Sequence, residues 1–342
     1  MNIKPVTFEF MRVTECGAIA AYQSIGLCDK NLADQLAVKA MRIMLNDIAI
    51  DGEIVIGEGE MDEAPMLYKG EKVGKGGLSI DIAVDPVDGT SNVSVGRGNS
   101  VSVLAAAEKN CLLKAPDMYM LKLAVGRNAT DAIDISKSLT YNIKNVAKSL
   151  NKEIREVGVA MLERDRHTKF ADEVREIGAK LFYFPDGDVA TAVQTCMPDS
   201  DIDIMYGYGG APEGVIAAAA LKALGGNFQG VLEHYNVMWP NEPESEEFTN
   251  NEKEQLKKLD VNVGDILTLD DLVIGEDFVF SCTGITKGDL VDGIYIDDGI
   301  MYTETLLIRG KTQTIRKIKS GHLIEKKPDD LRETFEYIKN KS

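Results

Sequence analysis

An apolar segment that leads into closely spaced acidic residues, Asp81–Asn92 (DIAVDPVDGTSN), is the most constraining feature of this sequence. Its apolar residues predict a short buried strand over residues 79–84, which delivers Asp85 to the strand end. Pro86 is expected to stop the strand, because proline has no N–H group to donate to a neighbouring strand. The segment therefore predicts a carboxylate held at the end of a buried strand.

The turn after this strand adds further groups that can bind a ligand. Asp88 lies three residues beyond Asp85, where both carboxylates can converge on one cation, and Gly89 permits close approach of the backbone. N–H groups and the hydroxyl near Thr90 can bind a phosphate oxygen. An isolated Asp-x-x-Asp-Gly sequence is usually only a solvent-exposed turn, but a buried strand before it favours a metal–phosphate site.

Three other carboxylates are weaker candidates, each with a structural alternative. Glu58 follows an apolar strand between Gly57 and Gly59, which also suits a hairpin turn with an exposed glutamate. Asp34 lies early in a predicted helix, and Glu213 follows Pro212 at the start of another. Both positions also favour an acid that merely compensates the helix dipole. The weight of these three residues comes from their acting together.

The order of predicted elements indicates a mixed α/β (α+β) fold. Apolar spacing predicts helices over 7–25 and 31–48, followed by short strands over 53–56, 79–84 and 100–107. In the middle of the chain, strands over 157–162, 180–184 and 202–206 alternate with helices over 169–177, 188–195 and 212–224. This alternation predicts a parallel sheet with helices on its faces. Further strands are predicted over 278–282 and 302–309, an exposed acidic loop and helix over 240–254, and a surface helix from 325.

Charge and residue usage exclude several classes of function. The 342 residues include 38 basic and 55 acidic residues, so the net charge of −17 argues against binding nucleic acid or anionic membranes. The five cysteines are scattered and never form a CxxC pair, which fits reduced thiols in a cytoplasmic protein. With only three histidines, a metal would be held by oxygen ligands, which favours Mg²⁺ or Mn²⁺. No signal peptide or membrane-spanning run is found.

Several longer strings resemble the GlpX-type class II fructose-1,6-bisphosphatases, within the Li⁺-sensitive, Mg²⁺-dependent sugar and inositol phosphatase superfamily. The resemblance runs from near the N-terminus to about residue 319. It is carried by RVTE (12–15), DKNLAD (29–34), IDGEIVIGEGEMDEAPMLYKGEKVG (50–74), APDMYM (115–120), PDGDVA (185–190), CMPDSDID (196–203), YGYGGAPEGV (206–215), TGITKGDL (283–290) and TETLLIRG (303–310).

The resemblance implies roles for individual residues. Metal ligands would be Asp34, Glu58, Asp85, Asp88 and Glu213, holding two or three Mg²⁺ or Mn²⁺ ions. Substrate contacts would come from Asp88, Gly89, Thr90, Tyr119, Arg164, Arg166, Asp186, Asp188 and Gly210. Catalysis would involve Glu58, Asp85 and Thr90, although the sequence does not single out a general base. The two arginines suit a substrate with a second phosphate, because guanidinium groups bind phosphate in a bidentate way.

The implied fold is the sugar phosphatase fold, a layered αβαβα sandwich of two subdomains with the site in the cleft between them. We expect an N-terminal subdomain over 1–150 with most metal ligands, and a C-terminal subdomain over 151–342 with the substrate contacts and one ligand. The implied activity is metal-dependent hydrolysis of the 1-phosphate of fructose 1,6-bisphosphate in gluconeogenesis. A homodimer or homotetramer is expected.

Three alternatives stay open. The enzyme could also hydrolyse sedoheptulose 1,7-bisphosphate, or it could act on a monophosphate such as inositol phosphate, which the paired arginines disfavour. A non-catalytic metal- or anion-binding regulator is the third. Position 88 bears on this last reading, because the class II pattern usually has Glu where this chain has Asp88. The shorter side chain retracts the carboxylate by roughly one bond length.

Overall fold

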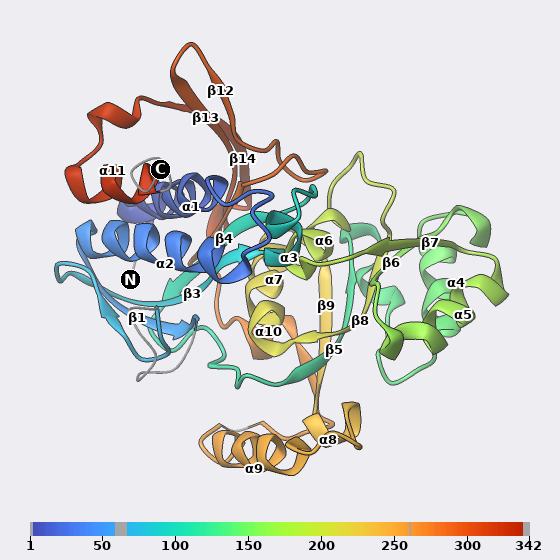
Figure 1. Cartoon of the computed structure of the whole chain (residues 1–342). Coiled ribbons are helices and arrows are strands. Elements are labelled where there is room, and N and C mark those ends of the chain that lie inside the picture. Colours follow the sequence, from blue (N-terminus) through green and yellow to red (C-terminus); the bar gives the residue numbers. More distant parts are fainter. Residues whose placement is uncertain (1–2, 59–66, 260, 338–342) are drawn as a thin grey trace. The chain divides into compact units, whose positions relative to one another are not determined.

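The computed structural model describes residues 3–58, 67–259 and 261–337 (Figure 1). The chain divides into two compact units, one formed by Met1–Leu112 with Gly275–Ser342 and the other by Leu113–Ile274. This division does not coincide with the single boundary expected near residue 150. The reason is that C-terminal strands return to pair with N-terminal ones, a long-range contact that leaves no local signal in the sequence. No helix among the described residues is long and apolar enough to cross a membrane.

The described part of the first unit contains an eight-stranded mixed sheet in the order β12-β13-β11-β4-β3-β1-β2, with β14 paired to β13. Strands β1 and β3 are parallel, and β11 pairs antiparallel with β4 and so joins the two ends of the chain. The strands are β1 (Ile50–Ile56), β2 (Lys72–Val73), β3 (Leu78–Asp88), β4 (Val101–Glu108), β11 (Phe278–Gly284), β12 (Tyr295–Asp297), β13 (Ile300–Arg309) and β14 (Thr314–His322).

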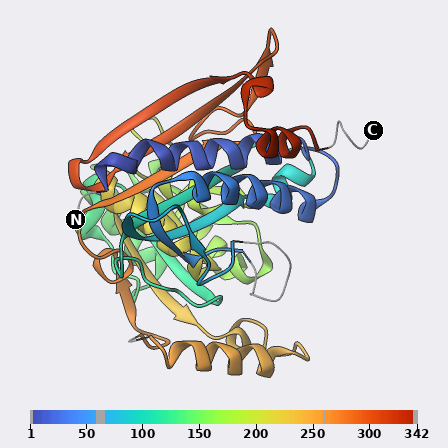
Figure 2. The same ribbon diagram turned by 90° about the vertical axis from the view of Figure 1, so that its left-hand side faces the viewer.

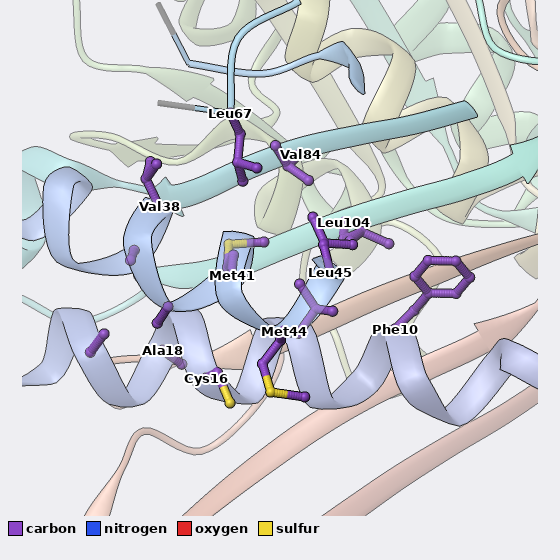
Figure 3. Packing of buried hydrophobic residues seen from close by; sticks show 14 of the residues in the cluster. Phe10, Cys16, Ala18, Val38, Met41, Met44, Leu45, Leu67, Val84 and Leu104 are labelled. Carbon is purple, nitrogen blue, oxygen red and sulfur yellow. The ribbon is translucent and has the colours of Figure 1, made fainter. Parts of the chain in front are cut away.

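Two long helices, α1 (Thr7–Tyr22) and α2 (Lys30–Asp47), pack side by side against this sheet, as Figure 2 shows. Asp29 begins α2 by accepting a hydrogen bond from the N–H group of Leu32, which satisfies a backbone donor that the helix itself cannot. Fully buried Phe10 and Met41 lie in the layer between helices and sheet (Figure 3). Burial of each such side chain contributes about 1.5–3 kcal/mol. The C-terminal helix α11 (Asp329–Phe335) packs on both, with Leu331 buried, so it belongs to the core more than the expected surface helix.

The junction of β3 with the short helix α3 (Thr90–Ser94) corrects the prediction for Pro86. Strand β3 does not stop at the proline but continues to Asp88, which pairs with Val101 of β4. The register shifts between Asp85 and Asp88, so Pro86 lies in an irregularity where no ladder hydrogen bond is required of it. Gly89 then turns the chain with a φ of 94°, a conformation that glycine adopts without strain.

The described part of the second unit holds a six-stranded sheet in the order β10-β9-β5-β8-β6-β7. The predicted parallel sheet is found only for β7-β6-β8, whereas β5, β9 and β10 are antiparallel to their neighbours. The strands are β5 (Tyr119–Val125), β6 (Gly158–Leu162), β7 (Lys180–Phe184), β8 (Ile204–Gly210), β9 (Asn227–Glu233) and β10 (Ile266–Thr268).

Helices cover both faces of this second sheet. Helices α4 (Leu139–Ser149) and α5 (Thr168–Ile177) share a core with alternate residues of β5, such as Leu123 and Val125. Helices α6 (Asp188–Gln194) and α7 (Ala211–Leu224) pack together and against β8. Because successive strand residues face opposite sides, Lys122 of β5 points away from the α4–α5 core. The prediction of a layered α/β (α+β) fold is confirmed within each unit.

The remaining helices are short or peripheral. The acidic stretch expected as a loop from 240 begins a helix already at Ser245, and most of its acidic side chains are exposed. The α-helices are α8 (Tyr235–Met238), α9 (Ser245–Leu256) and α10 (Leu269–Leu272). The 3₁₀ turns are η1 (Lys4–Val6), η2 (Arg127–Ala132), η3 (Ile154–Glu156), η4 (Asp165–His167), η5 (Gly310–Thr312) and η6 (Ile324–Lys326).

Candidate functional site

In the first unit, the β3–α3 junction gathers three of the predicted site residues. The hydroxyl of Thr90 donates hydrogen bonds to Asp34 Oδ1 at 3.1 Å and to the carbonyl of Val87 at 2.9 Å. Asp85 Oδ1 accepts a hydrogen bond at 3.1 Å from the N–H group of Val87. The tight path of the chain from strand to helix thus orients Asp85 through a backbone group two residues away, whereas Asp34, on α2, is held by the side chain of Thr90, 56 residues along the chain.

Asp88 is buried, with 4% of its surface exposed, whereas Asp85 is partly exposed. It ends β3 beside the fully buried Cys282 of β11. Burial raises the pKa of the Cys282 thiol, and the charge of Asp88 raises it further. This thiol therefore stays protonated at neutral pH and is not a candidate nucleophile.

Glu58 follows the end of β1 by two residues. Ile56 of β1 pairs with Ala83 of the parallel strand β3, two residues before Asp85. The carboxyl ends of parallel strands meet at the same sheet edge, so Glu58, just after β1, and Asp85, near the end of β3, lie toward the same edge. Gly57 is required here, since a Cβ atom would lie 2.0 Å from the carbonyl oxygen of Leu67. The rest of the predicted glycine-rich segment, residues 59–66, lies outside the described residues.

In the second unit, Arg166 is the centre of the predicted substrate contacts. Its guanidinium carbon lies 5.2 Å from the centre of the Tyr119 ring, and its Nη2 donates a hydrogen bond to the carbonyl of Tyr208 at 3.0 Å. Burial lowers the pKa of this guanidinium, which nevertheless stays a cation at neutral pH. Its Nε is buried and has no hydrogen-bond partner, so the residue retains a donor for an anion.

His167, which the sequence did not indicate, fixes the turn that carries Arg166. Its Nδ1 lies 2.8 Å from the carbonyl oxygen of Leu162, and its Nε2 accepts a hydrogen bond from the N–H group of Tyr208. These two contacts require a neutral ring with the proton on Nδ1. Burial lowers the pKa of His167 and favours that form. His167 therefore holds the backbone of this turn in place and does not transfer protons.

Arg164 and Asp186 lie side by side at a separation of 4.0 Å, and both are partly exposed. The pair joins the turn after β6 to the turn after β7, which are neighbouring parallel strands. Exposure weakens the attraction between the two charges, so Arg164 is able to exchange this partner for a ligand.

A buried group of charged residues lies behind these contacts. Nζ of Lys122 is 2.6 Å from Asp188 Oδ2. Asp188 Oδ1 and Glu213 Oε2 are buried without a hydrogen-bond partner. Both carboxylates crowd β8: a Cβ on Gly209 would lie 2.1 Å from Asp188 Oδ2, and a Cβ on Gly210 would lie 2.0 Å from Glu213 Oε2. The two glycines therefore make room for the two acids.

Burial raises the pKa of Glu213 to about 7, with a smaller upward contribution from Asp188, whereas Lys122 lowers it. A carboxylate that is costly to ionise without a partner is well suited to receive a cation. Its unpaired oxygen and the all-oxygen donor set fit Mg²⁺ or Mn²⁺.

The structure thus brings together Asp34, Asp85, Asp88, Gly89 and Thr90 in one unit, and Tyr119, Arg164, Arg166, Asp186, Asp188, Gly210 and Glu213 in the other. Within residues 3–58, 67–259 and 261–337, no three His, Cys, Asp or Glu side chains form a group that could hold a metal ion by themselves. Convergence of the five expected ligands therefore stays a prediction. Sequence reasoning missed Lys122 and His167, whose burial leaves no local pattern.

Comparisons with known proteins show the family to which the chain belongs. Residues 4–322 match the family model described as bacterial fructose-1,6-bisphosphatase, glpX-encoded. The chain is 48% identical over 330 residues to fructose-1,6-bisphosphatase 1 class 2 of Escherichia coli K12, which covers 96% of this chain and 98% of that protein. It is 50% identical over 323 residues to fructose-1,6-bisphosphatase class 2 of Haemophilus influenzae, covering 94% and 97%. A second Escherichia coli K12 protein, fructose-1,6-bisphosphatase 2 class 2, is 47% identical over 318 residues, covering 93% and 99%.

Proposed function

The chain belongs to the family of glpX-encoded bacterial fructose-1,6-bisphosphatases, and on that premise we propose that it hydrolyses fructose 1,6-bisphosphate to fructose 6-phosphate and phosphate. Water supplies the oxygen that enters the released phosphate, and the sugar C1 oxygen leaves with a proton. The observation that carries this proposal is the half-buried Arg166 beside Tyr119, whose Nε–H group has no hydrogen-bond partner and can donate to a phosphate.

Divalent metal ions belong to the proposal. The ligands would be Asp34, Glu58, Asp85, Asp88 and Glu213, and the expected complement is two or three Mg²⁺ or Mn²⁺ ions. When bound, such ions neutralise phosphoryl oxygens and lower the pKa of a bound water. The unpaired Glu213 Oε2 and the ordered carboxylates of Asp34 and Asp85 support this assignment.

The chain's own residues position the 1-phosphate. Gly89 lets the backbone approach the phosphate, and N–H groups at the start of α3 donate to its oxygens. The Thr90 hydroxyl, directed at Asp34 and at the carbonyl of Val87, is placed to donate to the same phosphate or to relay a proton, taking one from the attacking water as it passes its own to Asp34. Asp88 completes this set.

The second phosphate and the sugar would be held by residues of the second unit. Arg164 and Arg166 would bind the phosphate, because guanidinium groups form bidentate hydrogen bonds with phosphate oxygens. Asp186 and Asp188 would accept hydrogen bonds from sugar hydroxyls. Tyr119 would pack against the sugar, and the lack of a side chain at Gly210 would admit it.

The test is phosphate release from fructose 1,6-bisphosphate with Mg²⁺ or Mn²⁺, measured alongside sedoheptulose 1,7-bisphosphate and inositol monophosphate. We expect turnover of the ketose bisphosphate and loss of turnover after chelation. Full activity after thorough chelation would contradict the metal assignment. Binding of the sugar phosphate without turnover would instead indicate the non-catalytic regulator.

Two further expectations stay predictions. The chain is expected to act in the cytoplasm and to form a homodimer or homotetramer. Light scattering coupled to size-exclusion chromatography measures the assembly directly, and a monomer at micromolar concentration would contradict the second expectation.

A further inference from the structure

Lys122 is a charged residue in the middle of a buried strand. Only 1% of its surface is exposed, and the neighbouring β5 residues Leu123 and Val125 belong to the core on the other face of the sheet. Removing an ammonium group from water to this degree costs several kcal/mol, so a lysine at such a position requires close compensating partners. An apolar side chain of the same length would fill this space without the desolvation cost, so packing alone does not explain a lysine here.

The surroundings of Lys122 are shaped to fit it. Its Nζ lies 2.6 Å from Asp188 Oδ2, and a Cβ on Gly209 would come within 3.0 Å of that Nζ. A Cβ on Gly214, in the first turn of α7, would lie 3.4 Å from the Lys122 Cε. Because glycines on β8 and α7 have no side chain, there is space for Lys122 to reach Asp188 at the start of α6.

Two buried carboxylates interact with the charge of Lys122. Its ammonium forms an ion pair with Asp188, and its charge also acts on Glu213. Lys122 therefore acts on two buried carboxylates, and the charge of Arg166 also acts on Asp188. Each carboxylate still keeps one oxygen, Asp188 Oδ1 and Glu213 Oε2, without a hydrogen-bond partner. Buried oxygens without partners are rare in folded proteins, and two that share one lysine indicate a place where a ligand completes the set.

We infer that Lys122 is a positioning residue for the proposed reaction: it fixes Asp188 by an ion pair and partly compensates Glu213, so that their remaining oxygens stay available to substrate and metal. This inference rests on the proposed function. In this role Lys122 has no direct contact with substrate or metal. Its effect passes through the two carboxylates, as with other residues that orient the ligands of a metal.

The experiment compares Lys122→Met and Lys122→Arg with the unaltered chain. Calorimetry measures the affinity for Mn²⁺, and steady-state kinetics measure kcat and KM for fructose 1,6-bisphosphate. We expect Lys122→Met to weaken Mn²⁺ binding about 10- to 100-fold and to raise KM by a similar factor, the range found when residues behind metal ligands are replaced. Lys122→Arg keeps the charge and should recover most of the Mn²⁺ affinity.

Lys152 offers a matched control in the same unit. Its Nζ lies 2.7 and 2.8 Å from the two oxygens of Asp203, but its side chain is 35% exposed and lies outside the site. Lys152→Met should leave Mn²⁺ affinity and KM unchanged. Circular dichroism and a urea titration give the folded fraction of each variant, to which the affinities are referred.

Each outcome decides the inference. Wild-type Mn²⁺ affinity and KM in folded Lys122→Met would overturn it, as would equal losses in Lys122→Met and Lys152→Met, which would show a general effect of removing a paired lysine. If Lys122→Met does not fold, the decision rests on Lys122→Arg, compared with Glu213→Gln, a variant that lacks the expected metal ligand. Folded Lys122→Arg that binds Mn²⁺ no better than Glu213→Gln would also overturn the inference. If the unaltered chain binds Mn²⁺ but releases no phosphate, the proposed function fails while the Lys122 comparison of Mn²⁺ affinity still stands.

Discussion

The two units hold their candidate residues in different ways. In the first unit, Asp34 and Asp85 accept hydrogen bonds from Thr90 and from the N–H group of Val87, groups fixed by the turn between β3 and α3. In the second unit, Asp188 and Glu213 each keep a buried oxygen without a hydrogen-bond partner. The first pair is ordered by hydrogen bonds from the turn between β3 and α3, whereas each carboxylate of the second pair keeps one oxygen unpaired.

For Asp85, this difference goes with how far apart the interacting residues lie in the chain. Asp85 is fixed by a backbone group two residues away, whereas Asp34 and Thr90 are 56 residues apart, Lys122 and Asp188 are 66 apart, and Arg166 reaches a carbonyl 42 residues away. A local turn keeps its geometry through small shifts of the fold, whereas a long-range charge network depends on several elements at once. We therefore expect replacements in the first unit to affect chemistry, and replacements in the second unit to affect binding.

The largest effect is expected for Asp85→Asn. The amide oxygen can still accept the hydrogen bond from Val87, so the fold should remain, but a negative charge for metal binding is lost. Loss of several kcal/mol of charge stabilisation corresponds to a fall in kcat of about 100-fold or more. Phosphate release at saturating Mg²⁺ measures this, and urea titration should show a free energy of unfolding within about 0.5 kcal/mol of the parent.

The control for this variant is Asp47→Asn. Asp47 forms an exposed ion pair with Lys75, also in the first unit, and its loss should leave kcat unchanged. Equal activity of Asp85→Asn and Asp47→Asn would remove Asp85 from the metal site.

Arg166→Ala should act on binding. Loss of a charge-assisted hydrogen bond costs about 1.5–3 kcal/mol, so KM for fructose 1,6-bisphosphate should rise about 10- to 100-fold with a smaller change in kcat. A monophosphate substrate should be affected much less. Arg175→Ala is the control, because Arg175 also lies over a tyrosine, Tyr183, but on the exposed side of α5. Equal effects on bisphosphate and monophosphate would exclude Arg166 from the second-phosphate site.

Gly210→Ala tests the crowding in the second unit. Its φ of −67° suits alanine, so the variant introduces no backbone strain, but the new Cβ would lie 2.0 Å from Glu213 Oε2 and must displace that carboxylate. We expect Mn²⁺ affinity to fall about 10-fold. Gly321→Ala on β14, whose new Cβ would meet only side-chain carbons at 3.2 Å, should bind Mn²⁺ as the parent does. An unchanged affinity in Gly210→Ala would show that Glu213 is not held where the structure places it.

A smaller effect concerns stability in the first unit. Burial, with a smaller contribution from the charge of Lys327, lowers the pKa of His322 from 6.5 to about 4. Between pH 6.5 and 4, His322 is therefore protonated in the unfolded chain but neutral in the folded chain. The free energy of unfolding falls as the pH falls through this range. The loss should reach up to about 3 kcal/mol at pH 4.

The measurement is the free energy of unfolding in urea between pH 7 and 4.5, compared between the parent and His322→Gln. The comparison is needed because Glu15, 3.9 Å from His322, has a pKa raised by burial, which changes stability in the opposite direction as the pH falls. Parallel pH profiles of the parent and the variant would contradict this prediction, because they would show that the pKa of His322 is the same in the folded and unfolded chain.

The sequence predicted what depends on nearby residues. Helices α1 and α2, strand β7 and the start of α7 lie where apolar spacing and turn residues placed them. The Asp85–Gly89 turn was also predictable, because its acids, proline and glycine are consecutive. Strand β5 was not predicted as a strand, since its seven residues contain Lys122 and no clear alternation.

What only the tertiary structure decided is which distant groups meet. The return of β11 to β4 makes the first unit discontinuous, and the parallel order β7-β6-β8 brings Arg164 beside Asp186. Lys122 reads as an ordinary charged residue in the sequence and becomes a buried partner of Asp188 only in the fold. Backbone turns are set by local conformational preferences, whereas the pairing of buried charges depends on the path of the whole chain, because it is burial that makes a partner necessary.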